Sequence, residues 1–479
     1  MNYEAVIGLE VHIQVRTRTK MFCACPNQYG GEPNTRVCPV CLGYPGVMPV
    51  INREAVRKTI LAGSMCRCEI ASYSKFDRKN YFYPDMPKNY QISQYDLPLC
   101  GRGSLPVSGN GFSGADLPDK VIGITRIHLE EDVAKSTHYG YYSAIDFNRA
   151  GVPLMECVSE PDMRTPDEAY AYLTALKQIM QYADISDCDM EKGQMRCDVN
   201  ISVRPIDDPA FGTKIEIKNL NSFRAVHRAL AYEIDRQADV LDSGGKLRQE
   251  TRRWDDNAGV TSVMRTKESA HDYRYFPEPD LMPLDITPAW LEKIREDMPE
   301  LPAERRRRFV TEYGITDYDA DILTQDRNLA DYFESVAAES PDAKMAANWI
   351  MTELLSALSK TSVPVSASPV TPDALAELLR LIGDGTISGK IGKTIFAEML
   401  ETGHSPRRIV KEKGLEQVAD TGAIEAFVDR AISENPDAVE QYHGGKSKAL
   451  QYLVGQVMRM SRGKANPQMV VENLKTKLD

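Results

Sequence analysis

The stretch VIGLEVHIQV, residues 6 to 15, has the alternating pattern of a β-strand with two unlike faces. Its apolar residues stand at every second position and are Ile7, Leu9, Val11, Ile13 and Val15. Because successive side chains of a strand point to opposite faces, these residues suit a core, and Glu10 and His12 share the other face. On this stretch alone, a carboxylate beside an imidazole is as consistent with a solvated surface as with a site.

The sequence up to about residue 290 mixes further strands of this kind with helices. Three more segments alternate as strands do: VIGITRIHLEEDV (121–133), MRCDVNISVRP (195–205) and GTKIEIKNL (212–220). Residues 165–183 predict a helix, with Thr165 as N-cap and Pro166 in the first turn. Residues 222–241 predict another, ended by a pair of glycines. This mixture predicts an α+β domain around a largely antiparallel sheet.

The character of the chain changes near residue 290, after the proline-dense segment YFPEPDLMPLDITP (275–288). Beyond it the pattern is helical, and residues 371–400 predict two short helices around a Gly-rich turn. The segment SPRRIVKEKG (405–414) is a second candidate boundary. We therefore expect three domains, at residues 1–290, 291–405 and 406–479.

Composition and charge bound the class of protein. The 479 residues are 42% hydrophobic and 27% charged, which is ordinary for a globular protein, and no apolar run approaches the roughly 18 residues of a membrane helix. With no signal-peptide pattern at the N-terminus, a cytoplasmic protein is expected. The net charge of −11 argues against non-specific coating of nucleic acid. The segment from Lys446 to Asp479 nevertheless carries seven Lys or Arg against two acids, which indicates either an anionic partner or a solvated helix face.

Four of the ten cysteines form two close pairs, Cys23 and Cys25, then Cys38 and Cys41. Twelve polar, turn-rich residues separate the pairs, as in a zinc knuckle. Four thiolates can surround Zn²⁺ at about 2.3 Å and leave no open position, so a site of this kind is structural. The alternative is four unrelated thiols.

Two carboxylates interrupt apolar strand faces. Glu131 shares a face with Ile127 and Leu129, and Glu156 shares one with Leu154 and Val158. Carboxylates seldom lie on buried faces unless they are paired or bind a metal, and oxygen ligands suit Mg²⁺. A surface strand or a bulge is the alternative for each, and spacing alone does not show that these acids meet Glu10 and His12.

The segment KFDRKNYFYPDMPKNYQISQ (75–94) mixes cations, Lys79 and Lys88 among them, with aromatic residues and turn-forming prolines. Such a loop suits contacts to phosphates, ribose or bases, or it packs its aromatic residues on the domain. The sequence has neither a P-loop nor a GxGxxG motif after a strand, so any nucleotide is held by other means.

Taken together, these segments resemble the GatB/GatE family, which supplies the B subunit of the tRNA-dependent amidotransferase GatCAB. The motifs follow one another in family order: IGLEVHIQ, YPGVMPVIN, KFDRKNYFYPDMPKNYQISQ, ITRIHLEEDVAKSTH, SEPDMRTPDEAYAYL, RCDVNISVRP, KNLNSF, QETRRWD and DYRYFPEPDLMPL. The tail LVGQVMRMSRGKANPQMV resembles the small YqeY-like domain of that family. The resemblance covers essentially the whole chain.

The resemblance implies a subunit that phosphorylates the side-chain carboxylate of Glu-tRNA(Gln) or Asp-tRNA(Asn) with ATP and Mg²⁺. Ammonia from the glutaminase (A) subunit then gives the amide, and the small C subunit completes the heterotrimer. The resemblance also implies an N-terminal cradle similar to the glutamine synthetase and guanido kinase fold. The helical middle domain and YqeY-like tail would hold the tRNA, with Arg305 to Arg308 as a further basic run.

The same resemblance implies roles for individual residues. Those expected at the metal and phosphoryl-transfer site are Glu10, His12, Glu131 and Glu156, with Glu130 and Asp198 as weaker candidates. Lys79 and Lys88 would meet phosphates or line the ammonia path, and the four cysteines match the zinc-binding version of the family. Two other functions stay open: a stand-alone ATP-dependent amide ligase on a small carboxylate, and a zinc-containing RNA-binding scaffold without catalysis.

Overall fold

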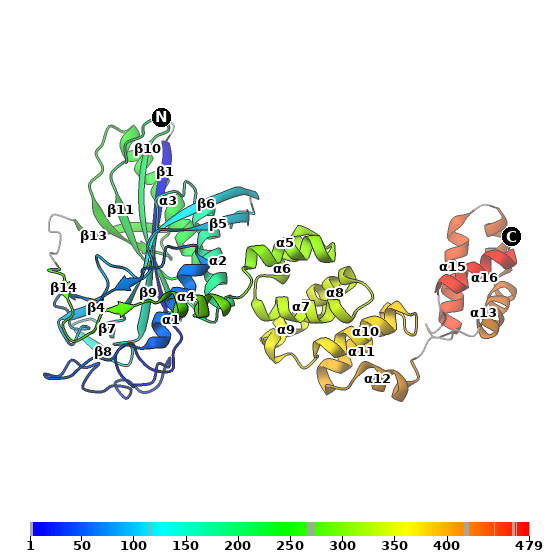
Figure 1. Cartoon of the computed structure of the whole chain (residues 1–479). Coiled ribbons are helices and arrows are strands. Elements are labelled where there is room, and N and C mark those ends of the chain that lie inside the picture. The colour runs from blue at the N-terminus through cyan, green and yellow to red at the C-terminus, as the bar shows by residue number, and fades with distance from the viewer. Residues whose placement is uncertain are drawn as a thin grey trace. The chain divides into compact units, whose positions relative to one another are not determined.

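The computed structural model describes residues 3–114, 116–266, 273–415, 421–444, 446–461, 465 and 467–478 (Figure 1). The chain divides into two compact units between Leu301 and Pro302. The first unit holds the sheets and the second is helical, which confirms the predicted fold class.

An eight-stranded sheet forms the centre of the first unit. Its spatial order is β13 (Val260–Thr266), β12 (Glu250–Asp255), β11 (Ile215–Leu220), β10 (Met195–Pro205), β1 (Tyr3–Gln14), β9 (Pro153–Ser159), β6 (Asp116–Glu131) and β5 (Gly103–Asn110). Every neighbouring pair is antiparallel except β11 and β12. The segment quoted first is thus a central strand of the sheet.

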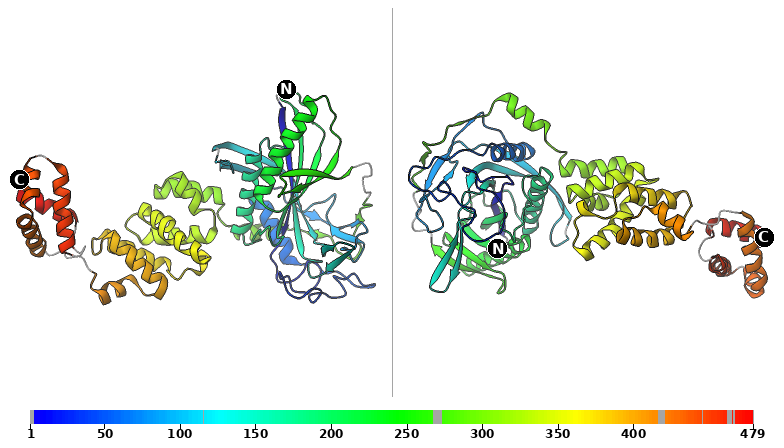
Figure 2. Two further views of the ribbon diagram at one scale, coloured as in Figure 1. Left: turned by 180° about the vertical axis from the view of Figure 1, so that it is seen from behind. Right: turned by 90° about the horizontal axis from the view of Figure 1, so that it is seen from below.

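The apolar face of β1 packs into the core of the first unit. Ile7, Val11 and Ile13 are fully buried, in one hydrophobic cluster with residues of three helices (Figures 1 and 2). These helices are α1 (Arg53–Met65), α2 (Pro166–Tyr182) and α3 (Phe223–Asp242). Thr165 caps α2 by accepting a hydrogen bond from the Glu168 amide at 3.1 Å, as its sequence predicts. With the apolar side of β1 covered, Glu10 and His12 lie on the opposite face of the sheet.

Small sheets complete the first unit. They are formed by β3 (Asp77–Asn80), β4 (Tyr90–Ser93) and β14 (Phe276–Pro277), by β2 (Tyr73–Ser74) and β15 (Leu284–Asp285), and by β7 (Lys135–Tyr139) and β8 (Tyr142–Asp146). Helix α4 (Pro288–Glu296) follows and packs on α1, with Ile294 in the same core. The first unit therefore extends beyond residue 290. The domain limit that the sequence analysis placed at residue 290 stays a prediction.

The second unit consists of helices. They are α5 (Pro302–Tyr313), α6 (Asp317–Leu323), α7 (Arg327–Glu339), α8 (Ala343–Trp349), the π-helix Ile350–Leu354, α9 (Leu355–Thr361), the 3₁₀-helix Val365–Ala367, α10 (Pro372–Gly383), α11 (Gly389–Thr402), α12 (Pro406–Lys413), α13 (Thr421–Glu434), α14 (Pro436–His443), α15 (Ser447–Met460) and α16 (Pro467–Leu478). Helices α10 and α11 are the predicted pair around a Gly-rich turn. No helix in the described parts of the chain is long and apolar enough to cross a membrane.

These helices pack around two separate hydrophobic cores. The first reaches from Phe309 to Val410 and the second from Ile424 to Leu478. Because Ile409 and Val410 belong to the first core, α12 packs with the helices that precede it. The predicted domain limit at residue 405 is not tested further and stays a prediction.

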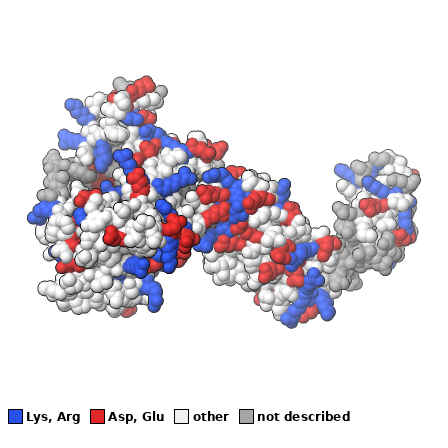
Figure 3. Space-filling model, in the orientation of Figure 1, with Lys and Arg blue, Asp and Glu red and all other residues white. Residues whose placement is uncertain are grey.

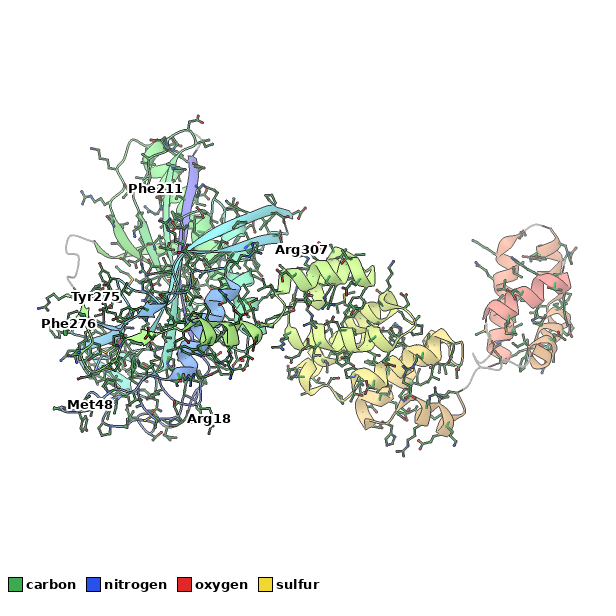
Figure 4. All side chains as sticks on the ribbon, viewed as in Figure 1. Arg18, Met48, Phe211, Tyr275, Phe276 and Arg307 are labelled. Carbon is green, nitrogen blue, oxygen red and sulfur yellow. The ribbon has the colours of Figure 1, made fainter. Side chains whose placement is uncertain are left out.

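The run of four arginines on α5 is largely neutralised. Arg306 pairs with Asp317 and Asp321 at 2.5 and 2.7 Å. Arg305 and Arg308 both pair with Glu334. Arg307 is exposed (Figure 4), and cations and acids are interspersed over the second unit in Figure 3. Three of the four arginines are therefore paired with acids of α6 and α7, so this run is not an open basic patch.

Candidate functional site

The polar face of the central sheet brings two predicted residues together. In the antiparallel register, His12 of β1 stands opposite Glu156 of β9, and His128 of β6 stands on the other side of Glu156. Side chains directly opposite each other across such pairs share a face and approach closely. Glu130, two residues after His128, shares this face by the period of two.

His12, Glu130 and Glu156 form a cluster able to hold a metal ion. His12 Nε2 lies 3.3 Å from Glu156 Oε2 and 3.8 Å from Glu130 Oε1. One ligand atom from each residue lies within 4.8 Å of the others. Glu130 is 2% exposed and Glu156 is 9% exposed. Two carboxylates removed from water at this separation need cations around them, so the donor set fits a divalent metal ion.

The charges of this cluster shift one another's proton affinities. Burial alone would lower the pKa of His12, but the hydrogen bond and charge of Glu156 outweigh it and raise that pKa. Burial would raise the pKa of Glu130, but the hydrogen bond from His128 and the charges of His12 and Lys79 lower it. Burial would likewise raise the pKa of Glu156, and His12, His128 and Lys79 lower it. Both carboxylates are therefore ionised near neutral pH.

Lys79 of β3 brings a cation to the cluster. Its ammonium lies 5.1 Å from the centroid of the Tyr273 ring. Burial would lower the pKa of Lys79, but the negative charges of Glu130 and Glu156 raise it, so the lysine stays protonated. A protonated lysine within the electrostatic influence of two carboxylates suits a site that handles phosphate oxygens.

The four predicted cysteines also converge. One sulfur from each of Cys23, Cys25, Cys38 and Cys41 lies within 4.8 Å of the others. A tetrahedron with Zn–S bonds of about 2.3 Å has S···S separations of about 3.8 Å, so this set fits a tetrathiolate metal site. The Cys38 amide donates to Cys41 Sγ at 3.2 Å. The hydrogen bond between Cys23 and Cys41 lowers the pKa of Cys41 to about 5 and raises the pKa of Cys23, so the thiolate of this pair lies on Cys41.

Comparisons with known proteins bear on both sites. Residues 5–292 match the GatB/GatE catalytic domain, and residues 331–478 match the GatB domain. The chain belongs to the GatB/GatE family. Proteins named as the B subunit of aspartyl/glutamyl-tRNA(Asn/Gln) amidotransferase are similar to it over their full length. The one from Moorella thermoacetica is 54% identical, with all of both chains covered, and the one from Carboxydothermus hydrogenoformans is 55% identical, with 99% of both covered.

Within this GatB/GatE catalytic domain, Glu131 lies apart from the cluster that holds Glu130. Successive residues of β6 point to opposite faces of the sheet, so the side chains of Glu130 and Glu131 lie on different sides. Glu131 is 3% exposed, forms an ion pair with Lys88 and accepts a hydrogen bond from the Ile92 amide at 2.9 Å. The structure thus brings Glu130 to His12 and Glu156, and it brings Glu131 to Lys88. The predicted metal-binding role of Glu131 is not tested by this placement and stays a prediction.

Glu10 and Asp198 extend the polar face but stay outside the three-residue cluster. They stand opposite each other in the register of β1 and β10. Glu10 accepts a hydrogen bond from Asn200 Nδ2 at 2.8 Å, and Asp198 forms an ion pair with Lys218 of β11. Their predicted roles therefore depend on a ligand large enough to reach along the sheet.

His128 is a member of this site that the motifs did not single out. Its Nε2 lies 3.5 Å from Glu156 Oε2 and 3.7 Å from Glu130 Oε2, and the residue is 4% exposed. The signal was present, because His128 and Glu130 have the same parity on one strand. Because alternate residues of a strand lie on opposite faces, the HLEED segment (128–132) places His128 and Glu130 on the face of the site and Glu131 on the other face.

Proposed function

We propose that the chain is the B subunit of a tRNA-dependent amidotransferase, the function that its relatives' names state for those proteins. It converts Glu-tRNA(Gln) or Asp-tRNA(Asn), or both, into the amidated form with ATP as phosphoryl donor. Its partners are the glutaminase (A) subunit, the small C subunit and the misacylated tRNA. This role places it in the cytoplasm, where aminoacyl-tRNA is made and used.

The cluster of His12, Glu130 and Glu156 beside Lys79 is the observation that carries this proposal. It lies on the matched catalytic domain and combines the two things that phosphoryl transfer to a carboxylate requires, a metal site and a protonated lysine. His12, Glu130 and Glu156 hold Mg²⁺, which when bound supplies charge neutralisation for the phosphate oxygens. His128, within 3.7 Å of both acids, keeps the two carboxylates in place.

The reaction has two steps that share an acyl phosphate, the product of the first step and the electrophile of the second. The side-chain carboxylate oxygen takes the γ-phosphoryl group of ATP, which gives an acyl phosphate and ADP. The nitrogen of ammonia then attacks the carbonyl carbon, and the bond from carbon to the phosphate oxygen breaks to give amide and phosphate. Lys79 remains protonated beside the cluster and stabilises negative charge that develops on phosphate.

The other candidates have supporting roles in this proposal. Lys88, held by Glu131, acts on the ammonia path or on the acyl phosphate. Glu10 and Asp198 extend the acidic face towards the nucleotide. Zinc occupies the four cysteines and serves the fold, because four protein thiolates leave no position for a substrate.

The test uses the chain together with its two partner subunits, ATP, Mg²⁺ and misacylated tRNA. We expect release of ADP that depends on the charged tRNA, followed by amide formation. Glu156→Gln should reduce both by at least about a hundredfold, the scale of losing one group that stabilises the transition state, while tRNA affinity is unchanged.

Glu160→Gln is the matched control. Glu160 lies just beyond β9 and accepts a hydrogen bond from Thr125 at 2.9 Å, so this variant changes a nearby acid without touching the cluster. ADP release that never depends on charged tRNA would overturn the proposal and favour an ATP-dependent ligase for small carboxylates. Equal losses in both variants would assign Glu156 to folding.

A further inference from the structure

The cysteine knuckle, defined as residues 23–43, shares a cavity with the buried ion pair of Lys88 and Glu131. The lining of this cavity includes Cys23 and Cys41 from the knuckle and both members of the pair. The side chains of Lys88 and Glu131 are 10% and 4% exposed. A metal site classed as structural thus lies directly beside two residues of the proposed amidation machinery.

Gly43 forms the contact between the knuckle and Lys88. Its φ is +69°, and a Cβ added there would lie 2.5 Å from Lys88 Cγ and 3.1 Å from Lys88 Cα. The glycine backbone therefore touches both the stem and the main chain of the lysine. Its own place is set by the turn of the second cysteine pair, in which the Gly43 amide donates to the Val40 carbonyl and the Cys38 amide to Cys41 Sγ. Movement of Cys41 is transmitted to Gly43 through the single intervening residue, Leu42.

Gly151 forms a second contact, on the side of Glu131. A Cβ at Gly151 would lie at ordinary contact distance from both groups, 3.5 Å from Cys41 Cβ and 4.0 Å from Glu131 Oε2, so this residue lies between the knuckle and the carboxylate. The Gly151 carbonyl also accepts a hydrogen bond from the Met21 amide, just before the first cysteine pair. The knuckle thus lies against both partners of the ion pair.

We propose that the cysteine knuckle positions Lys88. Four thiolates gathered on one metal ion fix Cys41 and Gly43, and Gly43 holds the lysine against Glu131. Loss of the metal then releases Lys88, while the cluster of His12, Glu130 and Glu156 keeps its geometry because Glu130 and Glu131 face opposite sides of β6. Gly43 is a positioning residue on this reading. The expected effect on catalysis, unlike the expected movement of Lys88, rests on the proposed function.

The experiment compares Gly43→Ala with Gly46→Ala in the assembled heterotrimer. Gly46 has a φ of +82°, and a Cβ there meets nothing within 4 Å, so its variant carries the same backbone strain without the contact to Lys88. Reductive methylation of lysine, read by mass spectrometry, measures the accessibility of the Lys88 ammonium. Zinc content per chain, ADP release and amide formation are measured on the same samples.

We expect Gly43→Ala to raise the labelling rate of Lys88 about tenfold, because labelling of a buried amine follows its local opening. Gly46→Ala should label as wild type does. Wild-type protein stripped of zinc by a chelator should show the same rise as Gly43→Ala, and it decides the question where that variant fails to fold. ADP release should persist in both while amide formation falls.

Unchanged Lys88 labelling in the zinc-stripped protein would overturn the inference. So would an equal rise in Gly46→Ala, because strain alone would then explain the effect. A rise in labelling with undiminished amide formation would support the positioning of Lys88 by the knuckle and would refute the proposed role of Lys88 in amidation, so the two failures are distinguishable.

Discussion

Glu130 and Glu131 are chemically identical neighbours on β6 that the structure assigns to different networks. Glu130 meets His12 and Glu156, whereas Glu131 meets Lys88. We therefore expect Glu130→Gln and Glu131→Gln to differ in how Mg²⁺ affects the free energy of unfolding. This comparison tests three statements at once: that Glu130 and Glu131 lie on opposite faces of β6, that Glu130 binds the metal, and that Glu131 forms a buried ion pair with Lys88.

The expected magnitudes follow from these contacts. Glu131→Gln leaves the buried Lys88 ammonium without its counter-charge, and breaking a buried pair in this way costs about 3–5 kcal/mol, with or without Mg²⁺. Wild-type protein at a Mg²⁺ concentration a hundred times Kd should gain about 2.7 kcal/mol. A variant that binds Mg²⁺ a hundredfold more weakly gains only about 0.4 kcal/mol under the same conditions. We expect this small gain for Glu130→Gln and the full gain for Glu131→Gln.

Native-state hydrogen exchange of the β1 amides, measured with Mg²⁺ and with EDTA, gives the free energy of opening at the strand that carries His12. The four values for the two variants and two conditions separate a metal ligand from an ion-pair partner. An equal Mg²⁺-dependent gain in Glu130→Gln and wild type would refute the assignment of Glu130. Loss of that gain in Glu131→Gln alone would show that Glu131 is the ligand.

Further predictions concern the four-cysteine site, the buried acid Asp132 and the second unit. Asp132→Asn should lower the free energy of unfolding by about 1.5–3 kcal/mol at pH 7, because it breaks the charge-assisted hydrogen bond from Arg196 at 2.9 Å, while water screens the Arg196 side chain, which is 37% exposed. Burial would raise the pKa of Asp132, but the charges of Arg196 and Arg149 lower it below the unfolded value of about 3.9. The stability that the Asp132 carboxylate contributes is therefore complete above pH about 3.9 and is lost as the pH falls through the lower pKa of the folded state. Urea unfolding across this pH range checks the sign. Lys20→Met should weaken zinc binding about 10- to 100-fold in a chelator competition, because the fully buried Lys20 ammonium lies 3.7 Å from Cys41 Sγ and offsets thiolate charge. Truncation after residue 415 removes α13 to α16 and should weaken tRNA binding in a filter assay, while far-UV circular dichroism reports the remaining helices and sheet intact.

Strands β1, β6, β10 and β11 and helices α2 and α3 were predictable because their side chains follow the periods of two and 3.6. The alternation in residues 6–15 fixed the inner face of β1, and Thr165 fixed the start of α2. Which strands neighbour β1 was not predictable, because β9 and β10 lie far away in sequence and nothing local specifies pairing. The contact between His12 and Glu156 follows from the pairing of β1 with β9.

The choice between Glu130 and Glu131 shows what strand periodicity leaves undecided. Both acids are buried, so an apolar face interrupted by a carboxylate pointed to Glu131 although its neighbour also needed partners. Buried polar residues on both faces occur where a strand passes between two polar networks, and only the contacts of each face separate them. The paired arginines of α5 make the same point, because a run of like charges reveals nothing about the acids on α6 and α7 that neutralise it.

The central place of β1 has a consequence for the order of events during synthesis. This strand leaves the ribosome before its neighbours β9 and β10, which end at Ser159 and Pro205. At about 5–20 residues per second, β1 waits roughly 10–40 seconds before both edges can be hydrogen-bonded. Throughout that interval it is an unpaired, half-apolar strand, the kind of segment that pairs with other chains. The contact between His12 and Glu156 can therefore form only late in synthesis. Until then, a chaperone or an early helix such as α1 must cover β1.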